Sequence, residues 1–155
     1  MSNRDPLKII LPVSVTSFVV GIAYVAFSII SLYNWISSTF IASNLLWPEY
    51  IPGDLAIFLI GLPIGITLLS SLHYTLKQDL IKSIACLLVG NAIGTSAMIM
   101  QILVTLANTA DALVLGEDVS TSLILNGILR IDSLLGYSTL PLLIVSISLY
   151  RKLSR

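Results

Sequence analysis

Residues 55–76 read LAIFLIGLPIGITLLSSLHYTL, a stretch without Asp, Glu, Lys or Arg that is bounded by Asp54 and Lys77. The hydrocarbon core of a bilayer is about 30 Å thick, and an α-helix that rises about 1.5 Å per residue crosses it with about 20 apolar residues. The stretch therefore predicts one membrane-spanning helix over about residues 55–75.

Charge-free intervals also lie on both sides of this stretch, at residues 9–48, 83–110 and 133–150. The second and third intervals each fit one helix, over about 83–108 and 133–150. The first is long for one helix and short for two, and we interpret it as a span over about 9–32 followed by a polar segment. The chain is thus predicted to be a single all-α integral membrane domain, residues 1–155, with four transmembrane helices arranged as two antiparallel hairpins.

The composition excludes several classes of protein. Of the 155 residues, 56% are hydrophobic and 10% are charged, the formal net charge is zero, and the mean hydropathy is +0.98. An ordinary soluble domain carries about 25% charged residues, so this chain has too few to cover a water-exposed surface. The same values exclude a disordered chain and a protein that binds nucleic acid through a basic face. We therefore expect its partners to be the lipid bilayer, other membrane subunits or further copies of itself.

The basic residues lie on one side of the predicted membrane. Every Lys and Arg except Arg130 precedes the first span, flanks the turn between the second and third, or follows the fourth. Cytoplasmic segments carry an excess of Lys and Arg, so both termini are predicted to be cytoplasmic. The expected location is the plasma membrane, crossed several times.

The outer side carries most of the acidic residues, and three charges are expected at its membrane interface: Asp54, Arg130 and Asp132. Before the fourth span, residues 119–132 place apolar and polar residues near helical spacing. Two interpretations stay open for this segment. It forms a short helix in the outer interface, which we favour, or it extends the fourth helix.

Two pairs of glycines four residues apart occur within the spans, Gly61 and Gly65 in the second and Gly90 and Gly94 in the third. Such pairs leave a groove on one helix face, into which a neighbouring backbone fits closely. Gly65 and Gly94 both fall near the bilayer middle, so we expect the two grooves to face each other and to pack the second helix on the third. The alternative is that one groove receives a helix of a partner protein.

Two prolines and three polar residues inside the spans are further candidates for function. Pro63 and Pro141 each lack an N–H and are expected to kink their helices. Asn91, Thr95 and Gln101 are uncharged polar residues of the third span. The amides are expected to bridge helices by hydrogen bonds of about 1 kcal/mol each, and the alternative is that the three residues line a small polar pathway.

No span contains an Asp, Glu, Lys or Arg in its interior, which argues against an ion pump, a voltage sensor or an ion-coupled carrier. The chain has one His, His73, and one Cys, Cys86. These are too few for bis-histidine haem, a zinc site, a disulfide or an iron–sulfur cluster. No set of nucleophile, base and acid can be assembled either. We therefore predict no catalytic residue, no cofactor and no metal site, and a protein that is not an enzyme.

The leading hypothesis is a non-catalytic subunit of a larger membrane complex of a bioenergetic kind, such as a terminal oxidase or another quinone-linked assembly. There the chain would support assembly and contact lipid or quinone in grooves between helices. The alternative is a homo-oligomeric channel or facilitator for a small or uncharged solute, lined by the three polar residues named above. An enzyme that acts on lipid through Asp54, Asp132 and Glu49 ranks third, because carboxylates at helix ends are more often solvated.

Overall fold

The computed structural model describes residues 6–41, 45–47, 50–115, 128 and 130–153. This part of the chain is helical and contains no strand; its elements are α1 (Pro6–Ile36), the short π-helix η1 (Ser37–Ile41), α2 (Leu55–Leu76), α3 (Leu80–Val114) and α5 (Ile131–Leu153). Among the described residues, four helices are long and apolar enough to cross a membrane. The prediction of an all-helical protein with four such helices is confirmed.

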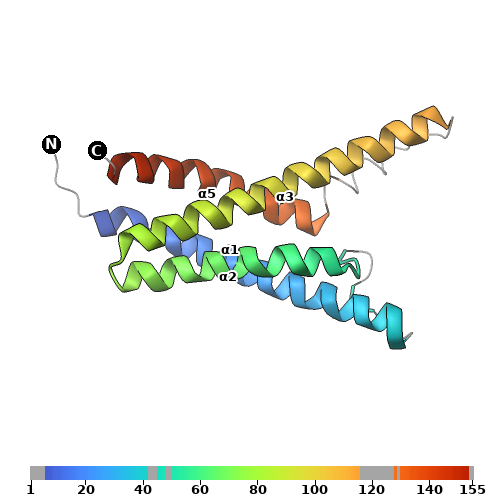
Figure 1. Cartoon of the computed structure of the whole chain (residues 1–155), viewed down its shortest axis with the longest axis horizontal. Coiled ribbons are helices and arrows are strands. Elements are labelled where there is room, and N and C mark those ends of the chain that lie inside the picture. Colours follow the sequence, from blue (N-terminus) through green and yellow to red (C-terminus); the bar gives the residue numbers. More distant parts are fainter. Residues whose placement is uncertain (1–5, 42–44, 48–49, 116–127, 129, 154–155) are drawn as a thin grey trace.

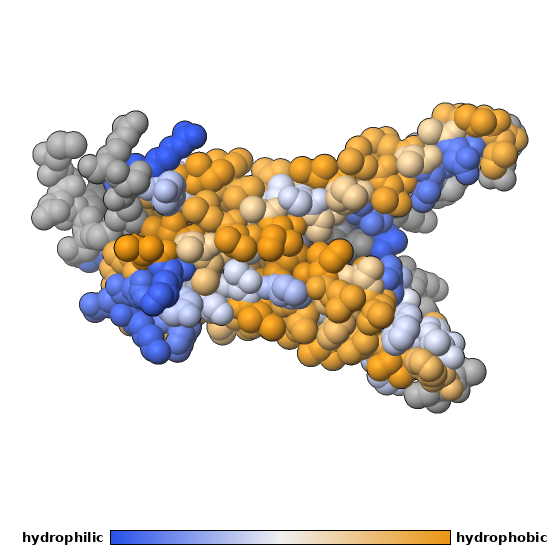
Figure 2. Space-filling model, viewed as in Figure 1, coloured by the Kyte–Doolittle hydropathy of each residue, from blue (hydrophilic) through white to orange (hydrophobic). Residues whose placement is uncertain are grey.

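Successive long helices run in opposite directions, so both ends of the chain lie at the same end of the molecule (Figure 1). α1 packs mainly on α2, α5 packs mainly on α3, and α2 packs on α3 to join the two pairs. Figure 2 shows hydrophobic residues along the body of the molecule and hydrophilic residues toward both of its ends. A bilayer requires this distribution, because charged groups are costly in hydrocarbon.

The face of α1 that is buried in the bundle is built largely from small residues. Ser14, Ser17, Gly21, Ser28 and Ser31 are all buried, and they follow one another at intervals of three, four or seven residues. This period of about 3.5 residues keeps one stripe of a helix against its neighbours over a long distance. Small side chains on that stripe let helix backbones approach closely.

α1 and α2 approach each other closely at Gly21 and Gly65. A Cβ atom on Gly21 would lie 3.0 Å from the Gly65 carbonyl oxygen, and one on Gly65 would lie 2.9 Å from the Gly21 carbonyl oxygen. The two backbones are therefore in direct contact, with no room for a side chain between them.

Buried hydroxyl groups connect three helices near the end where both termini lie. The Thr75 hydroxyl donates to the Ser71 carbonyl oxygen at 2.9 Å, and it lies 2.7 Å from the Ser14 hydroxyl and 2.6 Å from the Ser83 hydroxyl. Because a hydroxyl has one proton and two lone pairs, Ser14 and Ser83 donate to Thr75. These bonds join α1, α2 and α3 and satisfy polar groups that would be costly to bury alone.

The buried apolar residues form two small clusters. One contains Ile10, Ile84, Leu87 and Leu149, and the other contains Tyr24, Ile64 and Leu68. Many other large apolar side chains are exposed. This is expected where the surrounding solvent is hydrocarbon, which is as apolar as the side chains themselves.

The first helix is longer than its predicted span of 9–32. α1 continues to Ile36, and η1 follows it to Ile41. The reason is that Ser31 and Asn34, which lie on either side of the predicted end at residue 32, are fully buried against the connection to α2. The added turns therefore keep a buried face.

The third helix also exceeds its predicted span of 83–108, since α3 ends at Val114. No Pro or Gly, the two residues that most disfavour a helix interior, occurs between 95 and 115. The helix predicted over 119–132 falls outside the described residues, apart from 128, 130 and the start of α5 at Ile131.

The prediction that the two pairs of glycines face each other is wrong. Gly61 and Gly65 both face α1, where a Cβ on Gly61 would overlap the Ser28 hydroxyl and one on Gly65 would meet Gly21. The physical reason is the row of small residues on α1, among them Gly21 and Ser28, which lets α2 approach closely with its glycine face.

The glycines of α3 divide between two neighbours. A Cβ on Gly94 would lie 2.8 Å from Thr139 of α5, and one on Gly90 would lie 2.7 Å from the Leu68 side chain of α2. α2 therefore fills the space beside Gly90 with a leucine, and its own glycines point elsewhere.

A tight turn joins α2 to α3. The Asp79 side chain caps α3 by accepting from the Lys82 N–H at 3.2 Å, and it forms an ion pair with the Lys82 ammonium at 2.8 Å. The hydrogen bond from Lys82 holds the pKa of Asp79 below its ordinary value. The turn thus carries its charges outside the spans, as the sequence indicates.

Candidate functional site

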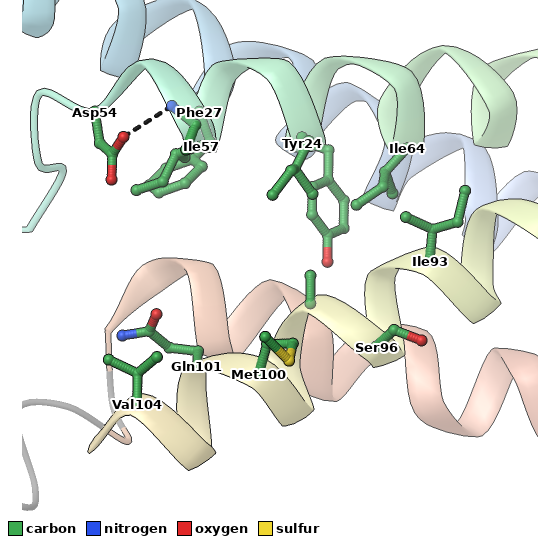
Figure 3. Close-up of a pocket in the computed structure, with 14 residues that line it drawn as sticks. Tyr24, Phe27, Asp54, Ile57, Ile64, Ile93, Ser96, Met100, Gln101 and Val104 are labelled. Carbon is green, nitrogen blue, oxygen red and sulfur yellow. Dashed lines mark hydrogen bonds between the residues drawn. The ribbon is translucent and has the colours of Figure 1, made fainter. Parts of the chain in front are cut away.

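A cavity of about 460 Å³ opens on the side of the molecule between α2 and α3, and we call it the groove (Figure 3). Its volume lies within the range of small-molecule sites, roughly 300–1,000 Å³. It is lined by Tyr24 and Phe27 of α1, by Asp54, Ala56, Ile57, Ile60, Gly61 and Ile64 at the start of α2, and by Ile93, Ser96, Ala97, Met100, Gln101 and Val104 of α3.

The spacing of these residues explains why they line one cavity. On α2 and α3 the lining residues recur every three or four positions, and such residues share one helix face. Ala97 on α3 is small and leaves open space in the groove, whereas Gly61 on α2 lines it with backbone only, because a side chain there would meet Ser28 of α1. Figure 3 shows the Tyr24 side chain pointing from α1 toward α3 across this space.

The groove is open toward an exposed, apolar side of the helix bundle. Among its lining residues, Ile60 is 48% exposed and Met100 is 62% exposed. Both are apolar and lie on helices long enough to span a bilayer. A molecule can therefore reach the groove from the side of the bundle, past exposed apolar residues.

The groove becomes polar at the end opposite the chain termini. An adjoining cavity of about 440 Å³ shares Asp54, Ile57, Gln101 and Val104 with the groove and adds Thr105, Asn108 and Arg130. We call this adjoining cavity the mouth. Figure 3 shows the Asp54 carboxylate and the Gln101 amide on opposite sides of the same end of the groove. The mouth thus combines one carboxylate, one guanidinium and two amides.

Asp54 is fixed in place by its role as the N-cap of α2. Its Oδ1 atom accepts from the Ala56 N–H at 2.8 Å. A carboxylate at a helix N-terminus also interacts favourably with the helix dipole. The carboxylate is exposed toward the mouth. The capping bond therefore holds it in position and leaves it accessible to a ligand.

Asn34 of α1 holds the connection that carries Asp54. Its side-chain nitrogen donates to the carbonyl oxygens of Leu46 and Ile51, each at 2.8 Å, and its Oδ1 accepts from the Leu46 N–H, also at 2.8 Å. Asn34 is fully buried. One side chain therefore satisfies three backbone groups of a connection whose described residues, 45–47 and 50–54, form no helix or strand.

Ser31 and Gly53 fix the end of this connection. The Ser31 hydroxyl donates to the carbonyl oxygens of Pro52 (2.8 Å) and Asp54 (3.1 Å), and it accepts from the Asp54 N–H at 3.3 Å. A Cβ on Gly53 would lie 2.8 Å from the backbone of Asn34. The connection thus lies directly on the α1 backbone, and this contact sets where α2 begins.

Of the interface charges predicted from the sequence, Asp54 and Arg130 lie together at the mouth. Asp132 lies in the first turn of α5, but its side chain is outside the described residues, and so is Glu49. Arg130 and Asp54 come from segments far apart in the chain. The sequence placed both at the outer interface without indicating that they share a cavity.

The three predicted polar lining residues do not share one cavity in the described chain. Gln101 lines both the groove and the mouth. Thr95 is buried with its hydroxyl 3.2 Å from that of Thr139 on α5. Asn91 is fully buried, its nitrogen donates to the Leu87 carbonyl at 2.8 Å, and its Oδ1 has no hydrogen-bond partner among the described residues.

The two predicted kink residues lie inside continuous helices. Pro63 is within α2 and Pro141 is within α5, and both side chains are exposed. The Pro63 carbonyl oxygen accepts from the Thr67 hydroxyl at 2.7 Å. Neither proline lines the groove or the mouth.

Several residues of the site were not singled out from the sequence. Tyr24 and Phe27 line the groove, while Ser31 and Asn34 hold the connection to α2. The signal that could have found them is the period of about 3.5 in the small residues of α1, which shows which face of that helix is buried. Ser31 continues this period, and Asn34 follows it three residues later.

Among the described residues, no group of three or more His, Cys, Asp or Glu is placed to hold a metal ion. His73 packs edge to face on Tyr74 near the end of α2, far along the chain from the residues of the mouth. Comparisons with models of protein families, with curated proteins and with solved structures found no match for this chain.

Proposed function

We propose that this chain is a non-catalytic integral membrane subunit that binds a long-chain amphiphile, a lipid or a quinone, in the groove. The observation that carries the proposal is the pairing of an apolar groove with a polar mouth. An amphiphile has the same division, because its chain is apolar and its head group forms hydrogen bonds. Opening toward the membrane gives such a molecule a direct route of entry.

The proposal of a larger complex rests on the exposed apolar surface. In each candidate span, only 28% to 33% of the most apolar window is buried inside the chain. α3 has 35 residues, which is roughly 52 Å of helix and more than a bilayer core requires. Its last turns still expose Leu106, Leu113 and Val114. Exposed apolar surface of this extent favours contact with lipid or with the helices of partner subunits.

We further propose that the helices form two antiparallel hairpins, α1 with α2 and α3 with α5, with both termini in the cytoplasm. The contacts between the helices favour this pairing. The described basic residues at the end with the termini are Lys8, Lys77, Lys82, Arg151 and Lys152, whereas Asp54, Asp111 and Arg130 lie toward the other end. The positive-inside rule then favours a mouth on the outer side of the plasma membrane.

Purification from native membranes tests the proposal as a whole. The chain, extracted into polymer-bounded lipid discs, is expected to carry other membrane proteins and a bound amphiphile that native mass spectrometry detects. A chain that runs alone, or only with copies of itself, would overturn the subunit role. A chain without any retained amphiphile would overturn the role of the groove.

Replacing Ala97 by phenylalanine is expected to empty the groove. The larger side chain would fill the space beside Tyr24, so the amount of retained amphiphile should fall at least about tenfold, which corresponds to about 1.4 kcal/mol. Ala85→Phe is the matched control, because Ala85 is exposed on the same helix and does not line the groove. Equal retention by both variants would contradict binding in the groove.

Cysteine labelling is expected to show the proposed orientation. In a Cys86→Ser background, Tyr50→Cys should react with a membrane-impermeant maleimide on intact cells, because Tyr50 is 61% exposed in the outer connection. Gln78→Cys, in the exposed turn between α2 and α3, should react only after the membrane is permeabilised. The reverse pattern would show that both termini are outside.

A further inference from the structure

The charges at the mouth are one acid and one base on different segments. Asp54 caps α2, and Arg130 lies directly before α5. The Asp54 carboxylate offers about four lone-pair sites, of which the capping bond to Ala56 uses one. The guanidinium of Arg130 is a planar fork of N–H donors, and this shape suits phosphate oxygens. A head group that carries both an anion and a cation would match this pair.

We infer that the groove selects a zwitterionic phospholipid whose head group carries a primary ammonium next to its phosphate. This inference rests on the proposed function, in which the groove binds an amphiphile. The ammonium binds the Asp54 carboxylate, the phosphate binds Arg130, and one acyl chain lies along the apolar groove past Ile60 and Met100. In the proposed orientation the lipid comes from the outer leaflet.

The amides of α3 add neutral hydrogen bonds to this arrangement. Gln101, Thr105 and Asn108 lie three and four residues apart and line the mouth together, so they share one helix face. The Thr105 hydroxyl donates to the Gln101 carbonyl at 2.9 Å. In this arrangement, the side-chain amides of Gln101 and Asn108 are available to form hydrogen bonds with the ester groups of the phospholipid.

Other amphiphiles fit the mouth less well. An anionic phospholipid without an amine would bring its negative charge close to Asp54, and like charges in partly desolvated sites repel. A quaternary ammonium has no N–H to donate to the carboxylate. The head oxygens of a quinone only accept hydrogen bonds, as an ionised carboxylate does, so Asp54 would gain no bond from a quinone. The carboxylate is therefore the residue that determines head-group selectivity.

Asp54→Asn tests this step without removing the helix cap. Asparagine caps helices about as well as aspartate, so α2 should still begin at Leu55. The full-length chain, delipidated in mild detergent, is offered an equal mixture of phosphatidylethanolamine, phosphatidylcholine, phosphatidylglycerol and a long-chain quinone. The lipids retained by the chain are counted by native mass spectrometry. The melting temperature of each variant is measured alongside to confirm that it is folded.

The wild-type chain is expected to retain phosphatidylethanolamine over phosphatidylglycerol at least about fivefold, the size of one partly exposed ion pair. Asp54→Asn should bring this ratio close to one. Asp111→Asn, which removes an exposed carboxylate of α3 outside the mouth, should leave the ratio unchanged. An unchanged ratio in Asp54→Asn, or a wild-type preference for the quinone, would overturn the inference.

The Ala97→Phe variant distinguishes a failure of the inferred head-group selectivity from a failure of the proposed function. If Ala97→Phe lowers total retention while Asp54→Asn leaves the ratio unchanged, the groove binds an amphiphile but does not select an amine. If Ala97→Phe retains as much lipid as Ala85→Phe, the groove is not the binding site, and both the inference and the proposed function fail.

Discussion

Replacing Asn34 by leucine is expected to lower the free energy of unfolding by about 3–5 kcal/mol. The change removes three hydrogen bonds of 2.8 Å and leaves the carbonyl groups of Leu46 and Ile51 and the N–H of Leu46 without their partner. Each buried or partly buried backbone group left unsatisfied costs about 1–3 kcal/mol. Leucine has the same number of side-chain heavy atoms in the same branched arrangement, so the change leaves no cavity and the value reflects mainly the lost hydrogen bonds.

Thermal unfolding in mild detergent, followed by size-exclusion chromatography with fluorescence detection, measures the effect. Ser38→Ala is the control, because Ser38 lies one turn further along, is exposed, and bonds only within its own turn, to the Trp35 carbonyl. A surface change of this kind shifts stability by about 0.5 kcal/mol or less. Equal melting temperatures for the two variants would contradict the role of Asn34.

Asn34→Asp separates the two kinds of bond that Asn34 makes. Aspartate keeps an acceptor for the Leu46 N–H but loses the donor, and it turns a negative charge toward two carbonyl oxygens. We therefore expect Asn34→Asp to be at least as destabilising as Asn34→Leu. If instead it were close to wild type, the bond from Leu46 alone would hold the connection.

The stability of this connection and the selectivity of the mouth are linked through Ser31. Asn34 holds the first part of the connection, and Ser31 bonds the backbone of Asp54 at its end. A variant that loosens the connection therefore also loosens the carboxylate at the mouth. In folded Asn34→Leu protein, the preference for an amine head group should fall together with the melting temperature.

The positions of the four spans could be predicted because charges mark the ends of membrane helices. Asp54 and Lys77 bound α2 closely, since a charge inside the hydrocarbon is costly and a capping aspartate begins a helix. The extra turns of α1 could not be predicted in this way. Asn34 and Ser31 look like interfacial residues until the connection that they bind is known.

The helix that packs against each pair of glycines could not be predicted from the sequence. Two glycines four residues apart indicate that a neighbouring helix approaches closely, but they do not indicate which helix it is. Gly61 and Gly65 face α1 because Gly21 and Ser28 are small as well. These residues belong to a period of about 3.5 that includes four serines, and a search for glycines four residues apart does not detect it.

Helix geometry alone could have predicted that the three polar residues of the third span do not all share one face. At about 100° per residue, Gln101 lies about 80° around the helix from Asn91 and about 120° from Thr95. The structure accordingly places Gln101 in the groove and Thr95 against α5. The meeting of Asp54 with Arg130 depends on how the helices pack, which no local pattern encodes.

Replacing Gly65 by leucine is expected to separate α1 from α2 and to cost about 3 kcal/mol or more. The new Cβ would lie 2.6 Å from the Val25 side chain and 2.9 Å from the Gly21 carbonyl oxygen. The valine can rotate, but the carbonyl belongs to a helix backbone and moves only with the helix. Overpacking of buried sites costs about 1–3 kcal/mol before any loss of neighbouring contacts, and here the Ser14 to Thr75 hydrogen bond would be weakened as well.

The melting temperature again measures this effect, with Ala26→Leu as the control on an exposed face of α1. Gly65→Ala should destabilise less than Gly65→Leu, since its single methyl group meets the same carbonyl but lacks the three further carbon atoms of leucine, which would also have to fit between the helices. Gly21→Ala meets the Gly65 carbonyl from the other side at 3.0 Å. Once one methyl group has separated the two helices, the second adds little strain, so the double variant should be less destabilised than the sum of the single variants. Strict additivity would show that the two glycines act independently and would contradict a direct contact between the backbones of α1 and α2.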